Sequence, residues 1–114
     1  MIGRIWHGWT LPENADAYEQ LLRGEVLPRI GRIEGYRGAQ LFRRPDGHEV
    51  EFVTLTLFDS LDAVREFAGE DYEVAVVPPE AQRLLAHYDE RSAHYDVRFE
   101  LREGAVELGD VAGH

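Results

Sequence analysis

The first ten residues of the chain place the strongest constraint on its fold. Residues 2–10 are rich in aromatic and β-branched side chains and are followed by a turn signal at Pro12, so they predict a β-strand. Because side chains alternate along a strand, Ile5, His7 and Trp9 share one face and the residues between them share the other. Neither face is purely polar, so we expect both to be covered, as in a central strand. A histidine between Ile5 and Trp9 would then lie inside the molecule, which makes His7 the first candidate for a catalytic group.

Composition bounds what such a chain can do. At 114 residues it predicts one domain, over residues 1–102, followed by a mobile glycine-rich tail over residues 103–114. The chain has no cysteine and no lysine, which excludes disulfides, thiolate chemistry and a Schiff base. The formal charge of -10 opposes binding to nucleic acid and to anionic membranes. With no apolar run near the ~18 residues of a bilayer span, we expect a cytoplasmic protein.

The remaining elements follow from helical and strand periodicity and from turn residues. We predict a helix over residues 15–27 capped by Asn14, and a hairpin of strands 36–44 and 49–58 joined at Pro45-Asp46-Gly47. Ser60 is expected to cap a second helix that Gly69 ends. A short helix over residues 79–88 and a last strand over residues 93–101 complete the pattern.

This βαββαβ order predicts an α+β, ferredoxin-like fold in which helices cover one face of a four-stranded antiparallel sheet. The other face would carry Trp6, Phe42, Phe52, Thr54 and Thr56, which is too apolar to leave in water. We therefore predict a homodimer in which two copies bury this face against each other.

Five stretches carry a family resemblance: residues 4–10, 13–18, 26–28 leading to Gly35 and Tyr36, 54–58 running into the Ser60 cap, and 94–97. Together they resemble the antibiotic biosynthesis monooxygenase (ABM) domain family of the dimeric α/β-barrel superfamily. The resemblance covers about residues 2–100, and it implies a ferredoxin-like subunit that pairs into a dimeric barrel. It also implies a substrate cavity between the helices and the sheet.

The resemblance identifies the fold better than the reaction. The superfamily includes cofactor-free oxygenases, heme-degrading enzymes, isomerases and members without an established activity. The heme-degrading branch uses an Asn, a Trp and a His at positions that align with His7, Phe67 and Val77 here. None of the three matches, so heme degradation in the manner of that branch is not expected.

A cofactor-free oxygenase needs a base, a dry cavity and a donor for developing charge. His7 is the candidate base, because imidazole titrates near neutral pH, and Trp9 and Tyr95 are candidate donors and flat walls. Expected substrate-binding residues are Tyr18, Leu22, Leu55, Phe67, Tyr72 and Tyr88. The alternative for His7 is a core histidine bonded to the backbone or to Tyr95, and no cofactor is expected.

Three functions remain open. The first is a cofactor-independent monooxygenase acting on a small aromatic or polyketide-like substrate. The second is a non-catalytic, small-molecule-binding or stress-related dimer on the same fold, and the third is an isomerase or decarboxylase that uses His7. His87 and His94 lie seven residues apart around Asp89 and Glu90, without the tight spacing of a metal site, so no metal is predicted.

Overall fold

The computed structural model describes residues 1–101, so the predicted tail over residues 103–114 lies outside the described residues. The elements are β1 (Ile2–Thr10), α1 (Pro12–Leu21), the π-helical turn η1 (Leu22–Val26), α2 (Leu27–Ile30), β2 (Tyr36–Asp46), β3 (Glu49–Phe58), α3 (Leu61–Ala68), α4 (Pro79–Gln82), β4 (Leu85–Tyr88) and β5 (Ala93–Asp96). None of the described helices is both long enough and apolar enough to span a bilayer.

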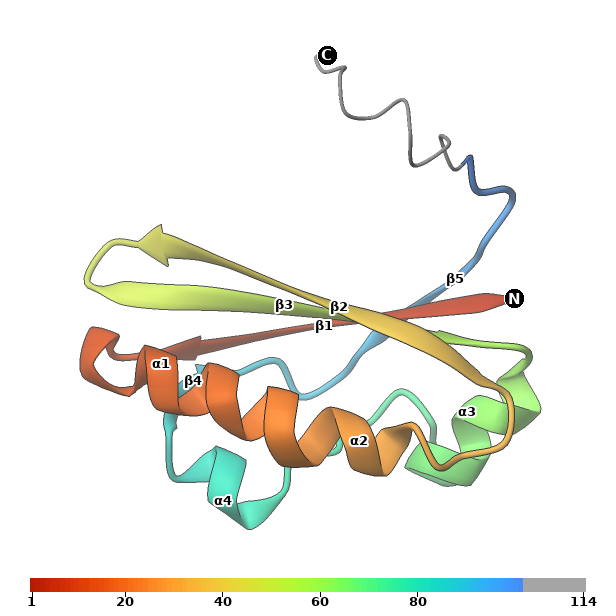
Figure 1. Ribbon diagram of the computed structural model, residues 1–114, viewed down its shortest axis with the longest axis horizontal. Helices are drawn as coiled ribbons and strands as arrows, with labels where there is room; N and C mark the ends of the chain where they lie inside the picture. The colour runs from red at the N-terminus through yellow and green to blue at the C-terminus, as the bar shows by residue number, and fades with distance from the viewer. Residues whose placement is uncertain (102–114) are drawn as a thin grey trace.

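The strands form one antiparallel sheet in the order β2-β3-β1-β4, with β5 also paired to β1. All helices lie on one side of it, which confirms the predicted α+β, ferredoxin-like fold (Figure 1). β4 pairs with Gly8–Thr10 and β5 with Ile2–Ile5, so together they act as one interrupted fourth strand. The prediction of a helix up to residue 88 was wrong, because the edge of β1 pairs with the backbone of β4. The last strand is also shorter than predicted and ends at Asp96.

The hairpin of β2 and β3 is confirmed, with Gly47 supplying the positive φ of 64° that its tight turn needs. Asp46 pairs with Glu49, so only two residues form the turn. This register places Leu41 opposite Thr54 and Phe42 opposite Val53.

The first helical segment differs from its prediction at both ends. α1 begins at Pro12, and Leu11 rather than Asn14 is its N-cap. The Asn14 side chain instead donates to the carbonyl of Leu84 at 3.4 Å, which ties the helix to the end of the α4 segment. The helical path then continues through η1 to Ile30. Pro28 is tolerated because it lies in the first turn after a widened π turn, where its missing N–H costs little.

α3 follows its sequence signals closely. The Ser60 hydroxyl accepts a hydrogen bond from the Ala63 amide at 3.2 Å, and Gly69 ends the helix with φ at 89°. Val64 is fully buried against Phe58 in the core between sheet and helices. The predicted cap and stop are both confirmed.

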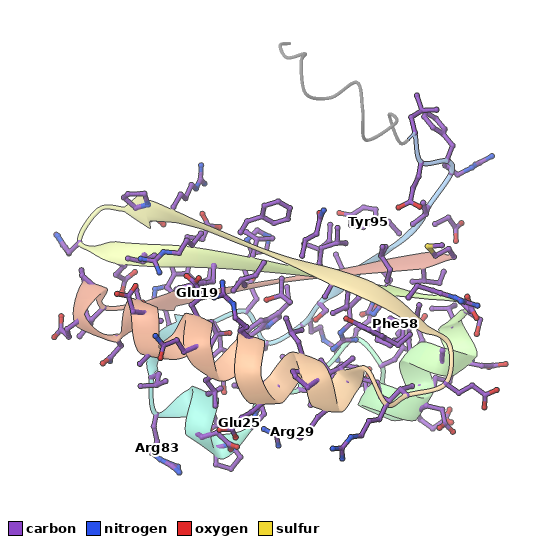
Figure 2. All side chains as sticks on the ribbon, in the orientation of Figure 1. Glu19, Glu25, Arg29, Phe58, Arg83 and Tyr95 are labelled. Carbon is purple, nitrogen blue, oxygen red and sulfur yellow. The ribbon has the colours of Figure 1, made fainter. Side chains whose placement is uncertain are left out.

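The helices cover the face of the sheet opposite to the predicted one. Phe52 and Phe58 are fully buried beneath the helices, and the Phe52 ring packs edge-on to Tyr18 of α1 at 4.8 Å. Figure 2 shows Phe58 on the helical side of the sheet and Tyr95 on the uncovered side. The prediction that Phe52 lies on the uncovered face was therefore wrong, and so were those for Trp6, Thr54 and Thr56, which line the space beneath the helices. Phe42 does lie on the uncovered face and is 49% exposed.

Candidate functional site

A cavity lies between the helices and the sheet. Its floor comes from β1 and β3, one wall from α1, η1 and α2, and the other from α3 and the segment that leads into α4. The empty space, including the mouth, is about 530 Å³, of which about 60 Å³ can hold the centre of a water-sized sphere. The lining residues are Arg4, Trp6, Tyr18, Leu22, Val26, Leu27, Ile30, Thr54, Thr56, Phe67, Val76, Val77, Pro78, Ala81 and Ser92. The cavity is thus a narrow apolar space with a few polar groups, as is typical of small-molecule sites.

A second, shallower groove adjoins the mouth of this cavity. It shares Val26, Ile30, Phe67, Val76 and Pro78 with the cavity and adds Arg29 and Ile33. This outer groove offers about 170 Å³ to the centre of a water-sized sphere. A ligand larger than the inner cavity can therefore extend into an apolar groove at its mouth.

Arg4 is the charged residue of the cavity, and its side chain is only 4% exposed. Its Nη1 donates to the carbonyl of Tyr72 and lies 3.0 Å from His94 Nε2, while its Nη2 donates to the carbonyl of Val74 at 3.2 Å. The guanidinium also lies over the Phe67 ring, 5.2 Å from its centroid. Burial lowers the pKa of Arg4 to about 10, which still leaves it charged at neutral pH.

Two polar side chains near Arg4 have hydrogen-bonding capacity left over. Arg4 has no lone pair, so His94 Nε2 must accept from it, and the proton of a neutral His94 then sits on Nδ1. Burial and the nearby Arg4 charge lower the pKa of His94, which favours this neutral form. Within residues 1–101, the buried His94 Nδ1 and Ser92 Oγ have no hydrogen-bond partner. Both are groups that a bound polar ligand or water can satisfy.

The aromatic walls are held in place by the fold. Trp6 Nε1 donates to the Asp89 carbonyl at 2.7 Å, so its ring is fixed and its donor is occupied. Tyr18 is 1% exposed, and burial raises the pKa of its phenol, which therefore stays neutral. Both residues line the cavity, Trp6 from β1 and Tyr18 from α1.

The structure brings together only some of the predicted site residues. Tyr18, Leu22 and Phe67 line the cavity as predicted. Tyr72 and Tyr88 flank it without lining it, Tyr72 beside His94 at 5.0 Å and Tyr88 beside Trp6 at 5.7 Å between ring centroids.

His7, Trp9, Leu55 and Tyr95 lie on the uncovered face, so the prediction that they face the helices was wrong. These residues occupy strand positions that alternate with the positions facing the cavity, so their side chains point to the opposite face of the sheet. Tyr95 is 58% exposed and lies away from the helices (Figure 2).

On the uncovered face, His7 takes part in a chain of polar contacts instead. Its Nδ1 lies 2.9 Å from Glu51 Oε2, and Arg44 Nε donates to the other oxygen of that carboxylate at 2.7 Å. His7 is therefore neither the cavity base nor a histidine bonded to the backbone. Trp9 next to it stacks on His87, with ring centroids 4.6 Å apart.

The lining residues that sequence reasoning did not name as site candidates include Arg4, Trp6, Thr54, Thr56 and Ser92. The two-residue hairpin turn between β2 and β3 fixes the face of Thr54 and Thr56, and the pairing of β1 with β3 places Trp6 and Arg4 opposite them. Within the part of the chain that the structure describes, no group of three or more acidic or histidine side chains is arranged to hold a metal ion.

Comparison with known proteins identifies the fold. No protein-family model matches the sequence, and no curated protein matches it significantly. Solved structures do match. An ABM-type protein from Bacillus cereus gives a TM-score of 0.64 at 14% identity, over 91% of this chain and 97% of that one. SnoaB from Streptomyces nogalater, a cofactor-independent oxygenase, gives 0.59 at 18% identity, over 90% and 98%.

The heme-degrader MhuD from Mycobacterium tuberculosis, solved with two hemes in its active site, gives 0.58 at 16% identity, over 90% of this chain and 100% of that one. At these identities the matches establish a shared fold and leave the reaction open.

Proposed function

We propose that this chain, which has the fold of the ABM-type proteins, is a cofactor-independent monooxygenase that oxidises a small aromatic or polyketide-like substrate in the cavity beneath its helices. The observation that carries the proposal is the cavity itself. Tyr18, Phe67 and Trp6 supply aromatic walls, and Arg4 supplies a buried positive charge. SnoaB, which shares the fold, is a cofactor-independent oxygenase, and this supports the reaction class.

The reaction requires few protein groups beyond those of this cavity. A methylene group next to a phenol or carbonyl loses a proton, and the resulting anion gives electrons to dioxygen. A carbon–oxygen bond forms, which yields a hydroperoxide, and loss of water then leaves a carbonyl group. One oxygen atom enters the product and the other leaves as water, so the substrate supplies all the electrons. The protein excludes bulk water and stabilises the anion.

His94 replaces His7 as the histidine of the proposed site, as a residue that positions Arg4. It contacts the cavity residue Arg4, whereas His7 contacts Glu51 on the other side of the sheet. The Nε2 lone pair of the neutral imidazole is occupied by Arg4 and its Nδ1 carries the proton, so His94 holds Arg4 in place and does not take up the proton of the substrate.

The active form is proposed to be a homodimer through the uncovered face. Phe42 is 49% exposed there, and Ile5, Val53, Leu55 and Leu57 are only partly buried around it. An apolar sheet face of this kind is a typical interface, and a second copy of the chain presents a matching surface. Trp6, Phe52 and Thr54 are not part of this interface, because they face the helices.

The test measures dioxygen uptake with a panel of hydroxynaphthalenes and anthrones, with and without a metal chelator. Val76 lines the mouth of the cavity and is 43% exposed, so Val76→Trp should block entry without disturbing the core. Val74 is 42% exposed in the same segment but does not line the cavity, which makes Val74→Trp a matched control.

We expect turnover that resists the chelator, falls at least ~10-fold in Val76→Trp and persists in Val74→Trp. Turnover that survives in Val76→Trp contradicts a reaction in this cavity. Binding of the panel without any oxygen uptake supports the alternative, a non-catalytic small-molecule-binding dimer.

A further inference from the structure

We propose that Arg4 is the counterion of an anionic ligand, so that the cavity selects a substrate that carries a negative oxygen, such as a phenolate, enolate or carboxylate. This inference rests on the proposed function for the location of the site, and it adds the ionisation state of what binds there. Ser92, which lines the same cavity and whose buried hydroxyl has no partner among residues 1–101, is proposed to donate a hydrogen bond to the same oxygen.

The first observation is that Arg4 is buried without a carboxylate. Arginines nearer the surface have acidic partners, for example Arg37 with Asp59 and Arg91 with Asp71. The contacts of Arg4 within residues 1–101 are two backbone carbonyls, one neutral imidazole and an aromatic face. No acidic side chain contributes to the shift in its pKa, which burial alone explains. A buried charge normally has a partner of opposite sign, because removing it from water is costly.

The second observation is the unused hydrogen-bonding capacity at the site. A guanidinium has five N–H groups, and the contacts of Arg4 involve Nη1 and Nη2, so its Nε–H has no acceptor among the described residues. The Ser92 hydroxyl is buried and also lacks a partner there. An oxyanion satisfies both donors at once, and charge-assisted bonds of this kind are the stronger ones.

The third observation is the shape of the surroundings. Apart from Arg4, Ser92 and two threonines, the lining is apolar or aromatic, so it suits the hydrocarbon part of an organic anion. A small inorganic anion would leave these walls unfilled. The ligand class is therefore a planar organic acid, with its charged oxygen at Arg4 and its ring between Tyr18 and Phe67.

An anionic site also explains how the protein would activate its substrate. A cation beside a phenol or enol favours the ionised form and so lowers its pKa. Arg4 would then hold the substrate in the state that reacts with dioxygen. The low dielectric of the cavity makes this effect stronger than it would be in water.

The test uses two probes of nearly the same shape, 4-nitrophenol and 4-nitrotoluene, with binding followed by calorimetry at a pH above the ordinary pKa of the phenol. We expect the native protein to bind the phenolate about 10- to 100-fold more tightly than the neutral probe. Arg4→Met should remove this preference while 4-nitrotoluene still binds. If the native protein binds both probes equally, the proposal is overturned.

A second measurement needs no variant, in case Arg4→Met fails to fold without its bonds to Tyr72 and Val74. The visible absorbance of 4-nitrophenolate reports the pKa of the bound probe, which should lie below that of the free probe. A bound pKa equal to or above the free value refutes the proposal. Because neither probe is a substrate, tight anion binding without oxygen uptake would leave this inference standing and reject the proposed reaction.

Discussion

Phe42 and Phe52 lie on neighbouring strands and offer a direct test of which sheet face the helices cover. Phe52 is fully buried, with Tyr18 edge-on at 4.8 Å and the Arg43 guanidinium 5.6 Å from its ring centroid. Truncating such a ring leaves a cavity and removes the aromatic pair, so Phe52→Ala should cost about 3–5 kcal/mol of unfolding free energy. For a domain of this size, the melting temperature should fall by about 15 °C or more.

Phe42→Ala is the matched control, because Phe42 is 49% exposed on the uncovered face. Its truncation should cost the isolated subunit about 1 kcal/mol or less. Thermal unfolding followed by circular dichroism, at a low and a high protein concentration, measures both changes. At low concentration Phe52→Ala should lower the melting temperature far more, whereas Phe42→Ala should weaken the concentration dependence expected from the proposed dimer. Equal losses in the two variants, or a larger loss in Phe42→Ala, would refute the assignment of the faces.

Two further predictions concern the uncovered face. Phe42→Glu places a charge in the proposed interface and should shift the protein from dimer to monomer in size-exclusion chromatography with light scattering; an unchanged dimer would move the interface elsewhere. The hydrogen bonds of His7 and then Arg44 to Glu51 hold the pKa of this carboxylate below its ordinary value of 4.5. The ionised carboxylate therefore stabilises the fold above that pH, and this stabilisation is lost as the pH falls through the lower folded pKa. Urea unfolding should therefore show that the unfolding free energy of the unmodified protein declines more steeply below about pH 4.5 than that of the Glu51→Gln variant. Parallel declines in the two proteins would argue against a stabilising contribution from Glu51.

Short-range sequence signals predicted the helices and strands well. The errors arose in deciding which alternate strand positions, odd or even, face the helices. The cap at Ser60, the stop at Gly69 and the hairpin turn at Gly47 depend on a few neighbouring residues, and the structure has all three. With two residues in the turn, an odd-numbered residue of β2 faces an even-numbered one of β3, so Leu41 shares its face with Thr54. The prediction that Phe42 shares a face with Phe52 and Thr54 instead moves every side chain of β3 to the wrong side.

The hydrophobic pattern could not correct this error, because the wrong face looks more like a core. Ile5, Val53 and Leu55 lie on the uncovered side, whereas the covered side includes Arg4, which is 4% exposed, and Thr56. A sheet that is covered by helices on one face and is apolar on the other has two apolar faces, and composition alone does not tell them apart. A buried arginine also has no local sequence signature, so the position of Arg4 in the cavity can be recognised only once the arrangement of the helices over the sheet is known.

The π turn between α1 and α2 has a consequence for how such a cavity can change over evolutionary time. A π turn is an α-helix with one extra residue, and here it contributes Leu22 and Val26 to the cavity wall. Gly24, at its centre, is exposed, and an added Cβ would meet nothing within 4 Å. A single codon gained or lost at this point therefore alters one stretch of the wall, while α1 and α2 keep the faces that anchor them to the sheet. Related chains can therefore vary the shape of their ligand cavity by changing the length of this turn as well as by substitution, without rebuilding the core.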